Sequence, residues 1–422
     1  MDTSGQLAAH FFREHSGRMV ASLARVYGMA HLDTILDAVQ DTFETALTHW
    51  RYHGPPDHPR AWLSQVARNK LINALKRDAR HSYADEAAAP LHALSTTDPD
   101  PALADEASTD SQIQLLVVCC RPALSERDRI LLTLHILCGF GIPELANALQ
   151  MNREAVKKAL QRSKALLRQK PLTLGQQSLA DVAPQLPTVC TILYLMFNEG
   201  YKSTRNSKGI DVDLCYEALR LTKLLHPVAP PEAEVDALLA LMFFGVARFP
   251  ARRAAYGDWI PLEEQERALW DRRLIAEGFH YLDQAQRRGH AGKYYLEALI
   301  ASYHCAAPRF DATDWGAIHR LYRLLENMEP NSPLIRLNRL IAQSYALGPL
   351  PVVSELAAFK GDGSAGSAFL LAATKAHVYQ RAGYTAQAHA AYEEALSLAQ
   401  NPLDKQLIRK RMEASKSAAT IR

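Results

Sequence analysis

Basic side chains recur at helical spacing in residues 153–168, where a single acid, Glu154, accompanies six Lys and Arg residues. The six are Arg153, Lys157, Lys158, Arg162, Lys164 and Arg168. The opposite face is mainly apolar and follows spacings of three and four: Val156, Ala159, Leu160, Ser163 and Leu167. Guanidinium and ammonium groups arranged in this way suit the phosphate oxygens and base edges of duplex DNA.

The elements that would position this helix lie directly before it. Residues 142–149 have a second apolar stripe, and Pro143 falls in a first helical turn, where its missing N–H does no harm. A three-residue turn, 150–152, ends in Asn152, which is a favourable N-cap. The pattern predicts a helix-turn-helix whose second helix enters a major groove. An ordinary helical hairpin with a solvated basic face remains the alternative.

A second helix carries the opposite charge. Residues 32–50 have an unbroken apolar stripe, and their other face is acidic: Asp33, Asp37, Asp41 and Glu44, with Gln40. This face is either solvated or a docking surface for a basic partner helix.

A Pro-rich stretch, 51–59, predicts a loop, and residues 60–80 predict a basic amphipathic helix. From Arg51 to Arg80 there are seven Lys or Arg and two Asp. Trp62 lies beside the loop, where an aromatic ring among cations suits the capture of a single-stranded base. A core Trp that packs the loop down is the equal alternative.

Composition limits the class of protein. The 422 residues have a net charge of +3, which excludes a uniformly basic coat but allows local patches. Strand patterns are nearly absent, so we expect an all-α fold. No apolar run approaches 18 residues and no signal peptide is evident, which predicts a cytoplasmic protein without a membrane segment. The six cysteines are scattered without CxxC spacing, so we expect core cysteines and no metal.

Two segments resemble the sigma-70 class of bacterial RNA polymerase sigma factors. DAVQDTFETALTHW (37–50) with AWLSQVARNKLINALKR (61–77) is similar to their region 2, and residues 122–168 are similar to region 4. Residues 82–112 hold seven acids and no Lys or Arg, which indicates a linker. Region 2 over 1–80, an acidic linker over 81–112 and region 4 over 113–172 resemble the extracytoplasmic-function (ECF) subgroup. One departure is Gly141-Ile142, where the family often has a Ser or Thr cap.

The resemblance implies two partners, core RNA polymerase and promoter DNA, and assigns residues to them. Core polymerase would dock on Asp37, Gln40 and Asp41, with Phe43 nearby. The −10 element would be melted and read by Arg60, Trp62, Arg68, Asn69 and Lys76. The −35 element would be read by Arg153, Glu154, Lys157, Lys158 and Arg162.

The C-terminal part, 185–422, has helical texture throughout, with helices expected over 189–198, 212–225, 234–249 and 261–278. Residues 369–402 have the spacing of a tetratricopeptide hairpin, and 292–330 and 334–359 predict further helix pairs. Residues 197–201 and the Trp270-Asp271 region resemble the extension of a sigma-factor subgroup with a tetratricopeptide-like domain. That resemblance implies a regulatory module with a protein partner of its own.

The sequence therefore predicts a promoter-specificity subunit that is not an enzyme and needs no cofactor. The runner-up is a stand-alone helix-turn-helix regulator with a helical-repeat sensor domain. A third hypothesis is an enzyme that uses Asn198, Glu199, Asp211 and Asp213, although capping and loop roles suit these residues better.

Overall fold

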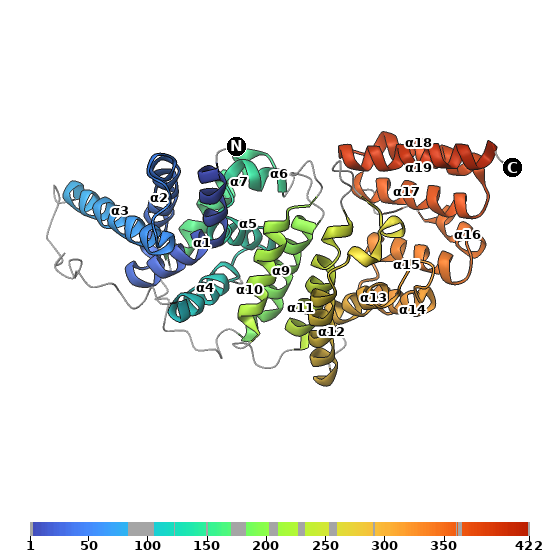
Figure 1. Cartoon of the computed structure of the whole chain (residues 1–422), viewed down its shortest axis with the longest axis horizontal. Coiled ribbons are helices and arrows are strands. Elements are labelled where there is room, and N and C mark those ends of the chain that lie inside the picture. Colours follow the sequence, from blue (N-terminus) through green and yellow to red (C-terminus); the bar gives the residue numbers. More distant parts are fainter. Residues whose placement is uncertain are drawn as a thin grey trace. The chain divides into compact units, whose positions relative to one another are not determined.

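The computed structural model describes residues 3–82, 105–121, 123–148, 151–169, 183–201, 210–226, 233–252, 260–289, 292–359, 361 and 365–420. Within these residues every regular element is a helix, which confirms the all-α prediction (Figure 1). The chain forms two compact units, Met1–Gly200 with Val212–Pro230, and Tyr201–Asp211 with Pro231–Arg422.

The first unit begins with a bundle of three helices. They are α1 (Thr3–Tyr27), α2 (Leu32–His53) and α3 (Pro59–Ser82). Ile35, Trp50, Leu63 and Leu71 are each at most 1% exposed, and full burial of such a side chain stabilises the fold by about 1.5–3 kcal/mol. The loop expected from residue 51 is shorter than predicted, because α2 continues to His53. The α2 helix is terminated by Gly54, which takes φ 75° and donates its N–H to Trp50 O, just before Pro55.

The helix-turn-helix region follows in the same unit. Its helices are α4 (Asp105–Cys119), α5 (Glu126–Ile136), α6 (Ile142–Ala148) and α7 (Arg153–Gln169). The α4 helix begins before the expected Ile113, so the linker is shorter at its C-terminal end; residues 83–104 lie outside the described residues. Ser125 caps α5, since its hydroxyl accepts the Asp128 N–H at 3.1 Å.

The helices α9 (Leu186–Tyr201) and α10 (Val212–Leu225) also pack in the first unit. Arg220 of α10 donates to Gln112 Oε1 of α4 at 3.1 Å, and the Cys138 Sγ lies 3.5 Å from Met196 Sδ of α9. The expected boundary at 185 therefore does not separate the two units. The apolar faces of α9 and α10 pack against the preceding helices, because an apolar helix face must be buried against another element.

The second unit is built on α11 (Ala233–Val246), which is buried almost all round. The helix expected over 261–278 is wrong in its first half. Two 3-10 turns, Leu262–Glu264 and Arg267–Leu269, precede α12 (Arg272–Arg287). Asp271 fixes the start of α12 because its carboxylate accepts the N–H groups of Arg273 and Leu274. Trp270 is 2% exposed, as expected of a core residue.

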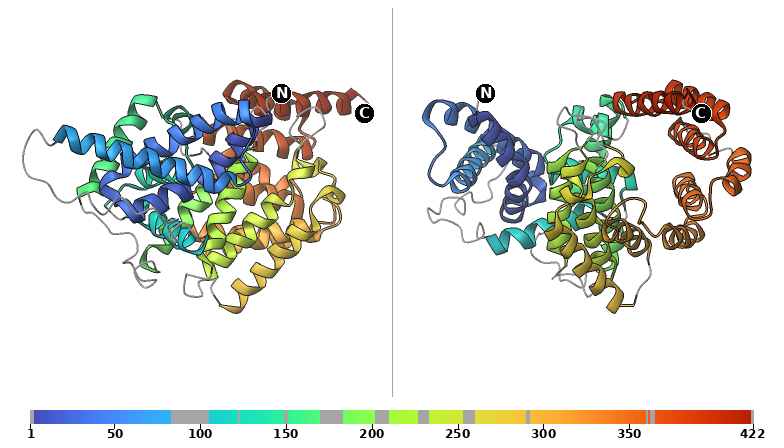
Figure 2. Two further views of the ribbon diagram at one scale, coloured as in Figure 1. Left: turned by 60° about the vertical axis from the view of Figure 1, so that its left-hand side comes forward. Right: turned by 45° about the vertical axis from the view of Figure 1, so that its right-hand side comes forward.

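The remaining helices follow one another around an arc, seen in the right-hand view of Figure 2. They are α13 (Lys293–Ala306), α14 (Trp315–Met328), α15 (Pro333–Ala346), α16 (Leu350–Ala358), α17 (Ala365–Arg381), α18 (Thr385–Leu398) and α19 (Pro402–Thr420). The helix pairs expected at 292–330, 334–359 and 369–402 are present. In the last pair Ala388 and Ala395 are fully buried, because their small side chains allow the helices to approach closely.

Candidate nucleic-acid interface

The second helix of the helix-turn-helix, α7, presents all five predicted −35 residues to solvent. Its inner face buries Val156 and Leu160, and its N-terminus is capped by Asn152, whose Oδ1 accepts the Ala155 N–H at 2.7 Å. Arg153, Glu154, Lys157, Lys158 and Arg162 are exposed, and among the described residues they form no ion pair. These side chains are available for phosphates and base edges.

The predicted −10 residues lie along α3 and are more strongly tied to the bundle. Arg60 donates to His15 Nε2 at 3.1 Å, and Arg68 donates to the Tyr27 hydroxyl at 3.3 Å. Asn69 is exposed and accepts from Gln65 at 3.3 Å, while Lys76 is partly exposed. The arginines on this face are thus held in position by α1, while Asn69 stays accessible.

The Trp62 side chain is neither fully buried nor fully exposed. Its ring centre lies 5.9 Å from that of the buried Trp50 and 5.5 Å from that of His49. The side chain is nevertheless only partly buried. Trp62 therefore packs the start of α3 against the end of α2 and leaves part of its ring open to solvent.

The acidic face of α2 is exposed at Asp37, Gln40 and Asp41. Phe43 differs from the expectation, because it is only 4% exposed and packs inside the bundle. Its place on the apolar stripe explains this: a residue that follows Val39 by four positions shares its face. Phe43 positions the acidic face and is not part of it.

The acidic helix and the basic helix meet in this structure. Lys164 and Arg168, at the C-terminal end of α7, each lie 3.1 Å from a carboxylate oxygen of Asp33 on α2. Partial burial raises the pKa of the neighbouring Asp37, and Lys164 opposes that rise. The sequence indicated a basic partner helix for α2 but not that it lies in the same chain. The complementary charges of 32–50 and 153–168 were the available signal.

The two helical regions also touch through their backbones. A Cβ built on Gly17 of α1 would lie 2.1 Å from the carbonyl oxygen of Leu137, at the end of α5. Only glycine allows so close an approach.

The four side chains considered for catalysis lie at or beside helix ends. Asn198 and Glu199 end α9, Asp211 and Asp213 begin the next helix, and residues 202–209 between them lie outside the described residues. All six cysteines are buried, and none of them forms a disulfide. In the described part of the chain, no group of three or more His, Cys, Asp or Glu is arranged to hold a metal ion, and no helix is long and apolar enough to cross a membrane.

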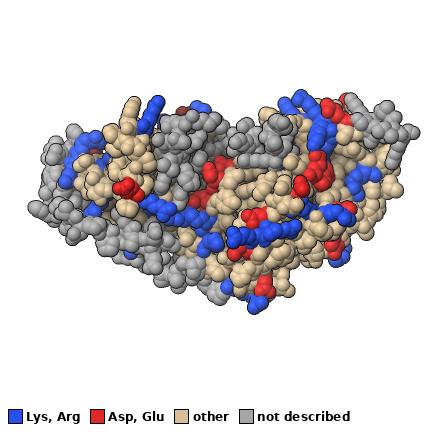
Figure 3. Space-filling model, viewed as in Figure 1, with Lys and Arg blue, Asp and Glu red and all other residues tan. Residues whose placement is uncertain are grey.

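Charge is balanced elsewhere on the molecule. On the face drawn in Figure 3, Lys and Arg side chains are interspersed with Asp and Glu, in keeping with a net charge of +3. A nucleic-acid ligand would therefore need a local basic surface, such as the exposed face of α7.

Comparison with known proteins gives matches over three parts of the chain. Sigma-70 region 2 matches residues 12–81, Sigma-70 region 4 matches 115–167, and a family of unknown function (DUF6596) matches 185–286. Uncharacterized protein R00370 of Rhizobium meliloti (strain 1021) is 34% identical over 406 residues, which are 94% of each chain. No solved structure matches. The three-helix bundle and the helix-turn-helix thus coincide with the two sigma regions, and the chain belongs to the sigma-70 family of RNA polymerase sigma factors.

Proposed function

We propose that the protein is an ECF-type sigma factor that acts in the cytoplasm, with a tetratricopeptide-like C-terminal unit that binds a regulatory protein partner. The observation that carries the proposal is the presence, in one chain and in order, of an acidic helix face, a basic helix with a partly open Trp, and an uncovered helix-turn-helix. Regions 2 and 4 with only a short linker between them support the ECF assignment.

In this proposal the α2 face, at Asp37, Gln40 and Asp41, binds core polymerase. The start of α3 reads the melted −10 strand: Trp62 stacks on a base, and Arg60, Arg68 and Lys76 contact the backbone. The exposed residues of α7 read the −35 element in the major groove. Each DNA surface is small, so each binds weakly alone, and attachment to one polymerase makes the second contact intramolecular.

The α7 helix has two functions in this proposal. Its first three turns face DNA, and its last turn, through Lys164 and Arg168, holds Asp33 of α2. Because Asp33 lies one turn from Asp37, polymerase that docks on the acidic face would compete with the last turn of α7. The paired arrangement is then a resting state that opens on binding to polymerase.

Co-purification with bacterial core RNA polymerase tests the proposal. We expect stoichiometric binding by the full chain and by residues 1–226, which contain the helices of the first unit. Asp41→Arg should weaken binding without loss of helical content, and Asp78→Arg, on the exposed side of α3, is the matched control. Duplex binding without polymerase binding would instead support the stand-alone regulator.

A further inference from the structure

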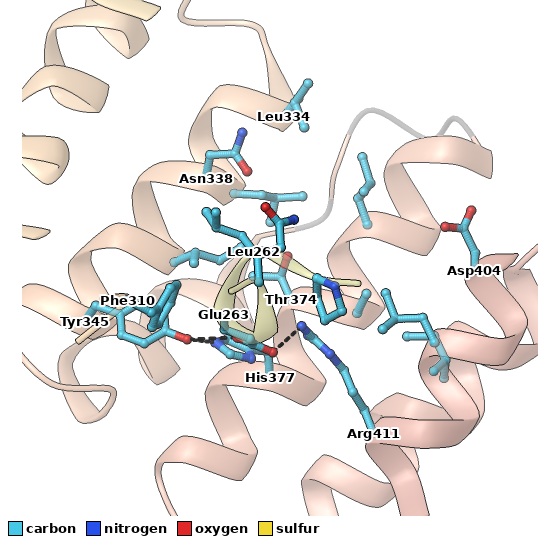
Figure 4. A pocket seen from close by; sticks show the side chains of 18 of the residues that line it. Leu262, Glu263, Phe310, Leu334, Asn338, Tyr345, Thr374, His377, Asp404 and Arg411 are labelled. Carbon is cyan, nitrogen blue, oxygen red and sulfur yellow. Dashed lines mark hydrogen bonds and ion pairs between the residues drawn. The ribbon is translucent and has the colours of Figure 1, made fainter. Parts of the chain in front are cut away.

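A cavity of about 450 Å³ lies within the second unit (Figure 4). The 3-10 segment Leu262–Glu264 forms one side, and α15, α17 and α19 contribute the others. Its volume falls within the roughly 300–1,000 Å³ typical of small-molecule sites. No part of the proposed promoter-binding machinery lines it.

The walls are mainly apolar. Leu334 and Ile341 of α15, Phe369 and Leu370 of α17, and Leu407 of α19 face the cavity. Contiguous apolar surface of this kind favours a hydrophobic ligand body, because each buried CH₂ group adds about 0.8 kcal/mol.

One end of the cavity is a closed polar network. The Tyr345 hydroxyl lies 3.1 Å from His377 Nε2 and 3.4 Å from Glu263 Oε2, and Arg411 forms an ion pair of 2.5 Å with Glu263 (Figure 4). Burial and the nearby Arg411 and Arg381 lower the pKa of His377 to about 3, so the ring is neutral. These contacts hold Tyr345, His377, Glu263 and Arg411 together and give the cavity a fixed end.

Two other polar side chains in the lining have no such partners. Asn338 and Thr374 form no side-chain hydrogen bond with any described residue, although Thr374 is only 5% exposed. Both lie on the cavity side of their helices in Figure 4. Buried polar groups are normally hydrogen-bonded, so these two are suited to a ligand.

Charge in the lining is also uneven. Arg248 contacts only Gln265 Oε1, at 3.4 Å, and the Trp270 ring, whose centre is 5.3 Å from its guanidinium carbon; it has no carboxylate partner among the described residues. A second cation, the buried Arg267, is close enough that Arg248 helps to lower its pKa, after burial. The two neighbouring guanidinium groups favour an anion beside Arg248.

We propose that this cavity binds an amphipathic small molecule with one carboxylate. Its apolar chain or ring lies along α15 and α17, its carboxylate pairs with Arg248, and Asn338 and Thr374 supply hydrogen bonds. Pairing stabilises both ions, since each alone is costly in a poorly solvated site. Asp404 and Glu263 also line the cavity, and they disfavour a second negative charge on the ligand.

Calorimetric titration of the full chain with decanoate, compared with decanol, tests this site. We expect decanoate to bind more tightly than decanol. Arg248→Gln should weaken decanoate binding about tenfold or more and leave decanol unchanged, since it removes one charge-assisted pair. The control is Arg309→Gln, an exposed guanidinium outside the cavity that pairs with Asp311 at 2.8 Å.

Asn338→Phe fills the cavity and should abolish binding of both probes, with thermal unfolding as the check that the variant folds. Equal decanoate affinity in Arg248→Gln and Arg309→Gln, or binding that survives Asn338→Phe, would overturn the proposal. So would an acidic peptide that binds, in an Arg248-dependent way, where decanoate does not, because the occupant would then be a protein. The assay needs no polymerase, so its failure leaves the promoter-binding proposal intact.

Discussion

The two units of this protein use charge in opposite ways. In the first, the five predicted −35 residues of α7 are exposed, and the ion pairs of Lys164 and Arg168 with Asp33 are partly exposed, with side chains 16%, 45% and 43% accessible. In the second, Asp236 is fully buried against Arg288, and the buried Arg267 donates to the carbonyl oxygens of His304 and Ala307.

This difference has an energetic meaning. Exposed ion pairs contribute about 0–1 kcal/mol each and weaken in salt, so the first unit can exchange an internal partner for DNA or polymerase. Removal of one member of a buried pair costs about 3–5 kcal/mol, because the other charge is left unpaired. The buried charges of the second unit therefore fix its fold, while the exposed charges of α7 can exchange partners.

The largest expected effect concerns Arg288. Arg288→Ala should destabilise the second unit by about 3–5 kcal/mol, since it leaves the Asp236 carboxylate buried without its cation. Urea unfolding of the full chain measures this. The neighbouring Arg287 pairs with Asp283 at 2.8 Å on the surface, so Arg287→Ala should cost less than about 1 kcal/mol. Similar losses in both variants would remove the contrast between buried and exposed pairs.

The second prediction concerns the stability of the fold at acidic pH. Burial first, then Arg248 and Arg267, lowers the pKa of His304 to about 3, which equals the value for His377. Both histidines are neutral when folded, whereas in the unfolded chain they take up protons below about pH 6.5. The contribution of the two neutral rings to the free energy of unfolding is complete above pH 6.5. It is lost as the pH falls toward 3, at about 1.4 kcal/mol per pH unit for each ring.

His377→Gln should therefore reduce the slope of stability against pH between pH 6.5 and 4.5 by about 1.4 kcal/mol per unit, which is the share of one ring. Unfolding midpoints measured across this range provide the test. His280→Gln, at an exposed position, should keep the parent slope. An unchanged slope in His377→Gln would show that His377 takes up its proton in the folded chain.

The third prediction distinguishes the DNA-facing residues of α7 from Lys164, which contacts Asp33. Lys157→Ala or Arg162→Ala should reduce transcription from a −35-dependent promoter about tenfold, because each removes a base or phosphate contact worth about 1–3 kcal/mol. Lys164→Ala should leave −35 recognition near the parent level, since Lys164 contacts Asp33. A run-off assay with reconstituted polymerase distinguishes them, and equal losses in all three would place DNA along the whole helix.

Much of the local structure could be predicted from the sequence. Short-range rules predicted the cap at Asn152, the all-α fold and the exposed residues of α7, because neighbours in the chain decide them. Contacts between distant segments could not be found in this way. The pairing of Asp33 with Lys164 and the approach of Gly17 to Leu137 depend on how whole helices pack.

The cavity was missed for the same reason. Its lining comes from segments between Tyr201 and Arg411, and no motif joins them. The sequence of residues 261–278 wrongly predicted one helix, because Leu262 and Leu269 lie seven residues apart, which is two helical turns. Because Trp270 is buried and Asp271 caps α12, the helix begins only at residue 272. Leu262 and Glu263, which precede it, line the cavity.

The smallest expected effect tests whether the paired state competes with polymerase. A variant with both Lys164→Ala and Arg168→Ala loses the two surface pairs to Asp33, at a cost of about 1 kcal/mol or less in stability. A ligand can shift an equilibrium only by its differential affinity, so core binding should tighten by no more than about fivefold. Fluorescence titration at low salt should show the gain, and 0.5 M salt should erase it, because screening already weakens these pairs in the parent. Weaker binding by the double variant would mean that polymerase uses these two cations itself, and that the contact with Asp33 is not a resting state.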